Sequence, residues 1–443
     1  MGIILLPLIG NKIIEQELSN HIEVLESYGL KMSDSSEQST YLSTAKHYKF
    51  TVKDGEKLTQ YLQQFSSSKL SYNSNLLLDG AVIGGDIQYS NFPFSEDLSV
   101  EVYPLSLSTN MMQTLKKEEK KFHDFLVKSL QEKAILYHVD YSIIKSKFHG
   151  FIKDINQSYL FENGANIGVN LKGFTFDGDG VITSPQNLNT QLKELEFSVD
   201  TKFEKMKTTL NDISNSLNIK SINSYLYTGN IGSLKLNTDS TYDGKSTVDL
   251  ENFKYNLSTN TQGIKAKGLV KASFDTFLVD IETKKYKLNK FNYNLSISEI
   301  EKDSFEKLRV LLLDKKSDNR QEILLVLNGI ISKGLKIDLE DFSVAKISVK
   351  DKADIDGFKV STNILLKEDA TQSSNTNIDY ITLEENLNLN TKVTVSKNMF
   401  SLLSENYPII ALARGYAKEL GEDLVFELEH KDSHVYINGK KIR

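Results

Sequence analysis

The nearest approach to a metal-ligand pair in this chain is His430 and His434, four residues apart in "ELEHKDSHVYING". Alternating apolar residues flank both histidines, so the segment reads as two strands of a hairpin. Aligning the apolar faces of the two strands predicts a register that pairs Leu428 with Val435 and Phe426 with Ile437. That register does not make the imidazoles cross-strand partners, and we expect two solvent-exposed loop residues rather than a metal site.

The acidic, glycine-rich "DGDG" at 177–180 has the composition of a calcium loop. Such a loop needs further oxygen ligands and a glutamate at its twelfth position. Counting from Asp177, that position is Leu188. We therefore predict a plain β-turn at 177–180.

The adjacent carboxylates Glu340 and Asp341 suggest the acid pair of a glycosidase. Neighbouring residues of a strand point to opposite faces. We therefore expect that these two carboxylates do not flank one bond together.

Other catalytic patterns are missing from the sequence. It contains no Walker-type loop, nucleophile elbow or dinucleotide fingerprint. It contains 0 cysteines, which excludes disulfides, thiolate zinc sites, iron–sulfur clusters and cysteine nucleophiles. We expect no catalytic, metal or cofactor-binding residues, no cofactor, and a protein that is not an enzyme.

The charge balance argues against nucleic acid as a partner. Lys and Arg number 53 against 59 Asp and Glu, which gives a net charge of -6 with both signs interspersed. Bidentate recognition of phosphates and base edges prefers arginine. The chain has only four arginines: Arg309, Arg320, Arg414 and Arg443.

The elements that would carry any site are mostly strands. At 443 residues the chain exceeds the usual size of one core, so we expect an elongated body or two lobes with a boundary near 200–220. Periodicity predicts helices over 11–28, 54–65, 110–134, 203–217, two segments between 300 and 334, and 398–421. Alternation predicts strands in "STAKHYKFTV", "GAVIGGDIQY", "ANIGVNLKGFTF" and "KIDLEDFSVAKISV", a turn at Asn438-Gly439, and a low-complexity loop at 368–377. The predicted fold class is α+β, β-rich, with meandering, mostly antiparallel sheets and covering amphipathic helices.

One pattern recurs at irregular intervals. Leu250, Phe253, Tyr255 and Leu257 are matched position for position by Leu288, Phe291, Tyr293 and Leu295. Looser copies are Leu192/Leu195/Phe197/Val199, Leu171/Phe174/Phe176 and Leu339/Phe342/Val344. Each reads as a bulge pair leading into a strand with one apolar face. The copies reflect either convergent strand chemistry or a meander that extends one continuous apolar surface.

The first residues, "MGIILLPLIGNK", contain no polar side chain from Ile3 to Ile9. This run is far shorter than the roughly 20 apolar residues of a membrane span, and it lacks the basic region of a signal peptide. One interpretation is that it packs on the body. The preferred interpretation is that residues 1–10 are the remnant of an N-terminal signal anchor, with 11–443 forming a β-rich envelope region.

Three segments resemble the YdgA-like family of bacterial envelope proteins. They are "LPLIGNKIIEQELSNHIEVLESYG" after the anchor, "GLKIDLEDFSVAKIS…STNILL" within 334–366, and the closing hairpin "DLVFELEHKDSHVYINGKKI" with Asn438-Gly439-Lys440. The resemblance implies attachment to the inner membrane of a Gram-negative bacterium through the N-terminus, with the bulk of the chain on the periplasmic side. The family has no established biochemical function, so no site residues follow from it.

Three functions remain open at this stage. The leading expectation is a tethered interaction or scaffolding module that binds envelope proteins. The alternative is lipid binding or transfer, which requires Phe253, Tyr255, Phe291 and Tyr293 on an apolar groove that no helix seals. A hydrolase would require a cleft with two carboxylates at catalytic separation.

Overall fold

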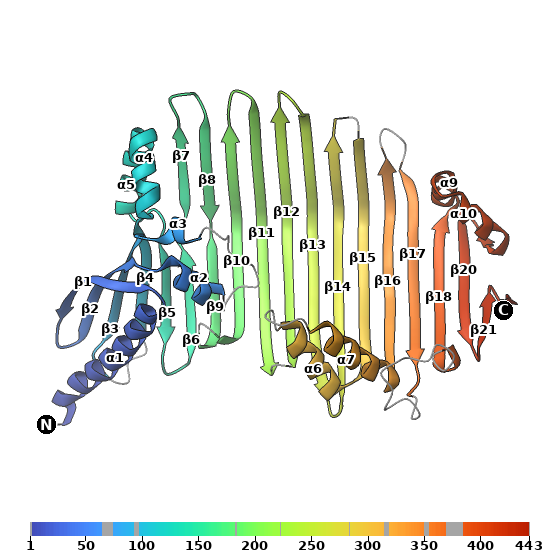
Figure 1. Cartoon of the computed structure of the whole chain (residues 1–443), viewed down its shortest axis with the longest axis horizontal. Coiled ribbons are helices and arrows are strands. Elements are labelled where there is room, and N and C mark those ends of the chain that lie inside the picture. The colour runs from blue at the N-terminus through green and yellow to red at the C-terminus, as the bar shows by residue number, and fades with distance from the viewer. Residues whose placement is uncertain are drawn as a thin grey trace. The chain divides into compact units, whose positions relative to one another are not determined.

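The computed structural model describes residues 2–63, 74–92, 97–181, 184–221, 223–282, 284–313, 319–349, 354–368 and 384–442. The chain forms two compact units, Met1–Lys202 and Phe203–Arg443, here called the N-terminal and C-terminal units (Figure 1).

The N-terminal unit contains an antiparallel sheet in which strands that follow one another along the chain lie next to one another. The order changes after β6: β6 pairs with β9, and β7 pairs with β8. Both β8 and β9 also pair with the longer β10. The strands are β1 (Leu30–Ser39), β2 (Ser43–Val52), β3 (Val82–Ser90), β4 (Asp97–Ser106), β5 (Tyr137–Ser142), β6 (Lys147–Ile152), β7 (Ile155–Leu160), β8 (Asn166–Lys172), β9 (Phe174–Val181) and β10 (Ser184–Asp200).

The C-terminal unit is also an antiparallel meander, with long strands from β11 to β18 followed by β20, β21 and β22. The short β19 pairs with the start of β20. The strands are β11 (Glu204–Ser221), β12 (Ser224–Ser240), β13 (Gly244–Gln262), β14 (Lys265–Ile281), β15 (Lys284–Glu301), β16 (Leu335–Val349), β17 (Ile355–Leu366), β18 (Leu387–Ser396), β19 (Lys418–Leu420), β20 (Asp423–Lys431), β21 (His434–Ile437) and β22 (Lys440–Lys441).

Helices are the minor component of both units. The N-terminal unit has α1 (Gly2–Ser27), α2 (Gly55–Gln63), α3 (Ser74–Leu78), α4 (Thr109–Glu118) and α5 (Lys120–Gln131). The C-terminal unit has α6 (Lys302–Leu313), α7 (Arg320–Ser332), α9 (Lys397–Asn406), α10 (Pro408–Ala411) and the 3₁₀ turn η1 (Leu412–Tyr416). The predicted β-rich α+β class with antiparallel strands is confirmed, as are the Asn438-Gly439 turn and the strands "STAKHYKFTV", "GAVIGGDIQY" and "KIDLEDFSVAKISV"; "ANIGVNLKGFTF" is divided between β8 and β9 at Gly173.

A line of irregular residues crosses seven strands of the C-terminal unit at one level. We call it the seam, and it consists of Asp212, Gly232, Asn252, Asp275, Lys290, Ala345 and Gly357, one on each strand from β11 to β17. The regular pairing skips these residues in every pair of neighbouring strands. On alternate strands the seam residue is left-handed, with φ of 52° at Asp212, 53° at Asn252 and 55° at Lys290.

The seam explains the two full copies of the recurring sequence pattern. At each seam residue two successive side chains face the same way, so the alternation of the strand shifts by one residue. Leu250 and Phe253 therefore share a face across Asn252, and Leu288 and Phe291 do so across Lys290. The pattern marks strands that keep a single apolar face in spite of this shift.

The helix predicted over 203–217 is wrong, because these residues belong to β11. Leu210, Ile213 and Leu217 stand three and four residues apart, which imitates helical spacing. The spacing of three comes instead from the seam residue Asp212.

Three further predictions need correction. The β-turn at 177–180 is wrong: these residues lie within β9, where Gly178 leaves room for the ring of Phe148. The helix over 398–421 ends at Asn406; a short turn of helix and η1 follow from Pro408, and β19 begins at Lys418. The helix over 110–134 is divided between α4 and α5 at Glu119.

Two predictions fall largely outside what the structure describes. Nearly all of the low-complexity loop at 368–377, and the side chains of residues 1–13, lie outside the described residues. In the described part of the chain, none of the helices combines the length and apolar composition needed to cross a bilayer.

Candidate binding face

One face of the C-terminal sheet is apolar over many strands, and we call it the binding face. It runs between two cross-strand rows that the register defines. One row is Leu210, Leu234, Leu250, Phe277, Leu288 and Ile347; the other is Leu217, Tyr227, Leu257, Val270, Leu295 and Leu339. Outside the seam and the irregular pair Glu340 and Asp341, alternation of the described strands β11–β17 places no charged side chain on this face between the rows.

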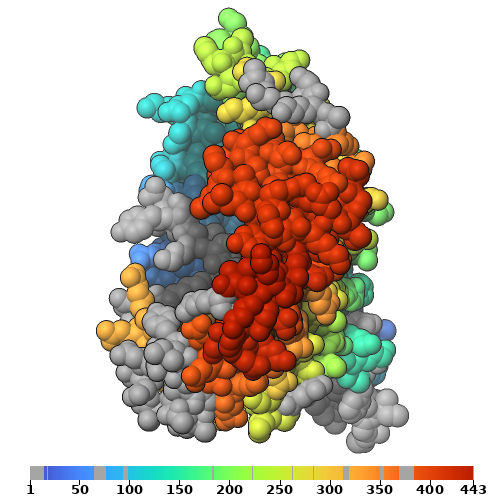
Figure 2. Space-filling view, turned by 90° about the vertical axis from the view of Figure 1, so that its right-hand side faces the viewer, coloured from blue at the N-terminus to red at the C-terminus, as the bar shows by residue number. Residues whose placement is uncertain are grey.

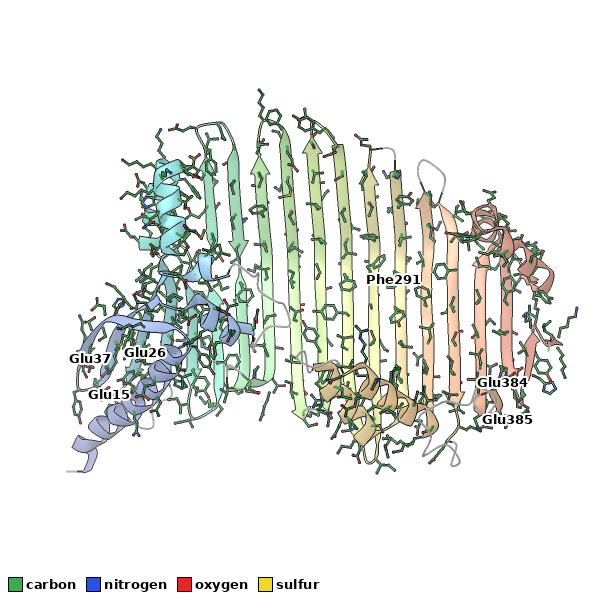
Figure 3. The ribbon with its side chains drawn as sticks, in the orientation of Figure 1. Glu15, Glu26, Glu37, Phe291, Glu384 and Glu385 are labelled. Atoms are coloured by element: carbon green, nitrogen blue, oxygen red, sulfur yellow. The ribbon has the colours of Figure 1, made fainter. Side chains whose placement is uncertain are left out.

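Side chains on the binding face are shielded mainly by their neighbours in the sheet. Phe253, Tyr255, Phe291 and Tyr293 are all half-buried, and none belongs to the hydrophobic clusters that the helices build. Figure 3 shows Phe291 in the middle of the sheet, away from α6 and α7. The aromatic residues singled out from the sequence therefore lie on one face and are not sealed under a helix.

Four phenylalanines form an aromatic ladder across the binding face, one from each of β14 to β17: Phe274, Phe291, Phe342 and Phe358. The rings of Phe274 and Phe291 stack, with centroids 4.8 Å apart and planes 12° apart. Phe291 and Phe342 meet edge to face at 6.2 Å, and Phe342 and Phe358 at 5.3 Å. The ladder forms a continuous apolar strip with ring faces and edges available to a ligand.

A hydrogen-bonded group of two tyrosines and one asparagine lies on the same face beside the ladder. It consists of Tyr227, Tyr255 and Asn215, and we call it the tyrosine trio. The Tyr255 hydroxyl donates to Asn215 Oδ1 at 2.6 Å and lies 3.0 Å from the Tyr227 hydroxyl. Gly229 permits this arrangement, since a Cβ there would lie 2.3 Å from the Tyr255 ring. Burial and the Tyr227 hydroxyl raise the pKa of Tyr255 above its ordinary value, so Tyr255 is uncharged at neutral pH.

Helices pack on the margins of this face. Val326 and Ile330 of α7 contact a buried cluster with Ala266, Ile300 and Leu335 at the strand ends. In Figure 1, α6 and α7 lie across the lower part of β14 and β15. At the other margin, Phe400 of α9 packs on Val395 and Leu424. The fully buried apolar side chains of the C-terminal unit are concentrated at these two margins.

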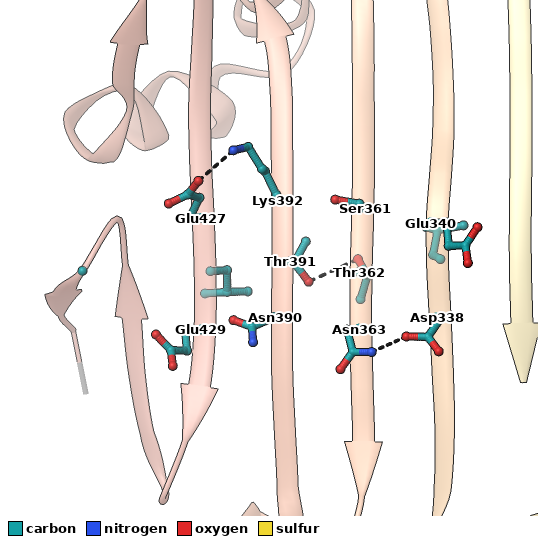
Figure 4. A pocket seen from close by; sticks show the side chains of 13 residues that line it. Asp338, Glu340, Ser361, Thr362, Asn363, Asn390, Thr391, Lys392, Glu427 and Glu429 are labelled. Atoms are coloured by element: carbon teal, nitrogen blue, oxygen red, sulfur yellow. Dashed lines mark hydrogen bonds and ion pairs between the residues drawn. The ribbon is translucent and has the colours of Figure 1, made fainter. Parts of the chain in front are cut away.

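The opposite face of the C-terminal sheet carries a polar pocket of about 540 Å³ (Figure 4). Its polar groups bond to one another: Lys392 Nζ lies 2.9 Å from Glu427 Oε1, and Asn363 donates to Asp338. Asp338 is also 2.9 Å from Lys336. The pocket therefore has the character of a solvated, internally paired surface.

The N-terminal unit contains the densest group of ionisable side chains, which we call the ionic network. Asp86 accepts hydrogen bonds from His47 at 2.6 Å, Tyr103 at 3.0 Å and Lys133 at 2.6 Å. Lys133 also bonds Glu101 at 3.2 Å and lies over the Tyr103 ring. Burial alone would raise the pKa of Asp86, but these three donors lower it below its usual value.

Geometry of the ionic network favours a structural role. Lys133 follows α5, so its two ion pairs tie the end of this helix to β3 and β4. His138 continues the network through Asp140, at 3.0 Å. Across the described residues, no group of three His, Asp or Glu side chains has the geometry to hold a metal ion.

The structure corrects the predicted register between β20 and β21, the strands that carry the two histidines. Leu428 pairs with Ile437 and His430 with Val435, two residues away from the prediction. Asp432 and Ser433 are both left-handed, with φ of 50° and 58°, and form a two-residue turn. His430 is buried and bonds the Leu387 carbonyl oxygen at 2.9 Å, so the prediction that it is exposed is wrong. The two imidazoles are nevertheless not cross-strand partners.

The premise of the prediction for Glu340 and Asp341, that they point to opposite faces, is wrong. Both residues fall in a bulge between Leu339 and Phe342, opposite the single residue Ser361. They therefore lie on the same polar face. Asn294 donates to Glu340, and Lys359 lies 3.6 Å from Asp341, so both carboxylates have partners within the sheet.

The sequence identified half of the aromatic arrangement. Phe253, Tyr255, Phe291, Tyr293 and Phe342 were visible in the recurring pattern, whereas Phe274, Phe358 and the trio members Asn215 and Tyr227 were missed. On β14 the chain runs the other way, and the pattern is reduced to Phe274-x-x-Phe277. Reading the pattern in reverse on alternate strands would have found this copy.

No family model, characterised protein or solved structure matches this chain.

Proposed function

We propose that the chain binds lipid acyl chains on the binding face and performs no chemistry on them. The observation that carries this proposal is the aromatic surface around Phe291, which is half-buried among its neighbours in the sheet and is not sealed under a helix. Exposed apolar patches on soluble proteins seldom exceed a few hundred Å² unless they serve a ligand or a partner. Six strand spacings separate β11 from β17, which makes the face about 29 Å wide.

Dimensions and chemistry both fit an acyl chain. One leaflet of a bilayer contributes about half of the roughly 30 Å hydrocarbon thickness, so an extended chain is shorter than the face is wide. The tyrosine trio offers hydroxyl and amide groups to a neutral or polar lipid head next to the ladder. We assign no catalytic residues, cofactor or metal to the face.

The wider setting belongs to the same proposal. The resemblance of both ends of the chain to YdgA-like envelope proteins supports a location on the periplasmic side of the inner membrane, with attachment through the N-terminus. An elongated body whose sheets are covered in part by amphipathic helices also remains part of the proposal. A tethered scaffolding role follows if the face is covered by a protein instead of a lipid.

The test is a titration of the purified chain with a fluorescent long-chain fatty acid. Phe291→Glu places a charge in the ladder and should weaken binding at least about tenfold. The matched control is Asn292→Glu, on the same strand but the opposite face, which should bind like the parent. Urea unfolding of both variants verifies that they fold.

Absence of binding by the parent chain, or equal binding by Phe291→Glu, would overturn the lipid proposal. In that event, native mass spectrometry of the chain purified from an envelope fraction tests the scaffolding role. A stoichiometric protein partner would then support that role.

A further inference from the structure

A second apolar surface in the C-terminal unit projects away from the sheet. It is formed by α10 and η1, and we call it the docking tip: residues 407–416. Ile409 and Leu412 are 77% and 75% exposed, although they are large aliphatic side chains in ordered helical turns. Tyr407 and Tyr416 flank them and are also exposed. In Figure 2 the red-orange part of the chain that includes these turns forms much of the visible surface.

The docking tip is apolar on both of its sides. Ile410, Ala413 and Ala417 pack inward on the cluster around Phe400 and Leu424. That packing holds the segment in place, so exposure of Ile409 and Leu412 does not result from a loose chain. A helical segment with large apolar side chains on both its inner and its outer side normally has a second apolar environment on the outer side.

The docking tip is continuous with the binding face. The cluster beneath it includes Phe358, which is the last ring of the aromatic ladder, and Phe426. Phe426 pairs with Val393, in the same row as Tyr293 and Phe342. The apolar surface therefore passes from the ladder to the cluster that supports the tip, without crossing a charged row.

Charges around the tip favour an anionic surface. Between Glu405 and Glu419, the only Lys, Arg, Asp or Glu residues are Arg414 and Lys418, in a chain whose net charge is -6. Glu419 is paired with Lys397 at 3.1 Å and with Arg414, which leaves Lys418 as the cation of this segment that faces a ligand. Asn438 donates to the Tyr416 carbonyl oxygen at 2.6 Å, which brings the hairpin that carries Lys440 and Lys441 beside η1.

We propose that the docking tip inserts into the interface of an anionic lipid bilayer. Ile409 and Leu412 enter the acyl boundary, the two tyrosines lie at headgroup level, and the neighbouring lysines contact the anionic headgroups. This inference deepens the proposed lipid binding, because it names the bilayer as the place where acyl chains reach the binding face.

The experiment is co-sedimentation of the chain with vesicles of phosphatidylglycerol and phosphatidylcholine, compared with phosphatidylcholine alone. The double variant Ile409→Glu/Leu412→Glu should lower the vesicle-bound fraction at least about tenfold. The matched control is Ile264→Glu, since Ile264 is also 77% exposed but lies in the β13–β14 turn. It should sediment like the parent, and the parent should prefer the anionic vesicles.

Three results would overturn the inference: no sedimentation of the parent, equal loss in both variants, or equal binding to both kinds of vesicle. Fatty-acid titration of the double variant separates this test from that of the proposed function. Retained fatty-acid binding with lost sedimentation supports the docking tip. Sedimentation without any fatty-acid binding would support the tip and overturn the role of the binding face.

Discussion

The two units of this chain differ in how far the apolar face of their strands is covered. In the N-terminal unit, Val52, Tyr89 and Phe148 are at most 3% exposed, and α2 supplies Leu58 to the cluster around Val52. In the C-terminal unit, the aromatic ladder remains half-exposed between two helical margins. Burial stabilises the first unit, whereas the second keeps apolar area in contact with water. Surface retained at that cost in stability is better explained by binding than by folding.

The largest expected effect tests this difference directly. Phe148→Ala removes a ring that is 3% exposed and should cost about 3–5 kcal/mol of unfolding free energy. Phe291→Ala removes a half-exposed ring and leaves no closed cavity, so about 1–2 kcal/mol is expected. Urea unfolding followed by hydrogen exchange in each unit measures both. Equal losses would show that the binding face is as closed as the N-terminal core.

Attachment of α1 to its sheet depends on Lys46. This ammonium lies 3.0 Å from Glu15 on α1 and 2.9 Å from Glu37 on β1, two residues labelled in Figure 3. Burial alone would lower the pKa of Lys46, but the two carboxylates raise it above its ordinary value. Lys46→Met should cost about 2 kcal/mol and increase amide exchange in residues 15–27.

Lys49→Met is the control for that experiment, because Lys49 pairs with Asp34 at 3.3 Å on a more exposed surface. It should change stability by less than about 0.5 kcal/mol. A similar loss in both variants would contradict the special role of Lys46.

The ionic network makes the N-terminal unit sensitive to acid. Because the folded-state pKa of Asp86 is lowered, its contribution to stability is present above the unfolded-state pKa of about 3.9 and is lost as pH falls through the lower folded-state value. Asp86→Asn should cost about 1–2 kcal/mol at pH 7 and much less at pH 3. Urea unfolding of the region β2–β5 in the parent and in Asp86→Asn, at both pH values, measures this loss of unfolding free energy. A loss that is the same at both pH values would exclude the charge of Asp86 as its cause.

The smallest effect concerns the seam. Asn252→Gly keeps the left-handed backbone available and should change the unfolding free energy by about 0.5 kcal/mol or less. Asn252→Val, which disfavours φ of 53°, should cost about 1–2 kcal/mol. Thermal or urea unfolding distinguishes them, and equal stability of the two variants would show that the strand relaxes out of the left-handed state.

Strand identity was predictable where alternation was uninterrupted, as in β2 and most of β3, and β16 was predicted although Glu340, Asp341 and Ala345 interrupt its alternation. The prediction failed at Asp212, because a left-handed residue inside a strand produces helical spacing without any helix. It failed again at the β20–β21 hairpin, where the length of the turn at Asp432 and Ser433 sets the register. Local periodicity shows neither the left-handed backbone of a strand residue nor the length of a turn. Exposure was also unpredictable, since Phe148 and Phe291 stand in similar strand patterns, and only the packing of distant elements seals one of them.

The seam constrains the length of all seven strands together, because it fixes which residues of each strand face which side of the sheet. On either side of it, each strand has its own assignment of odd and even residues to the two faces, and all seven strands change that assignment at the same level. A single residue inserted or deleted between the seam and one end of a strand would turn that half of the strand inside out, exposing lysines where its neighbours present phenylalanines. Length changes in these strands are therefore tolerable only at the hairpin ends, or in compensating pairs on one strand.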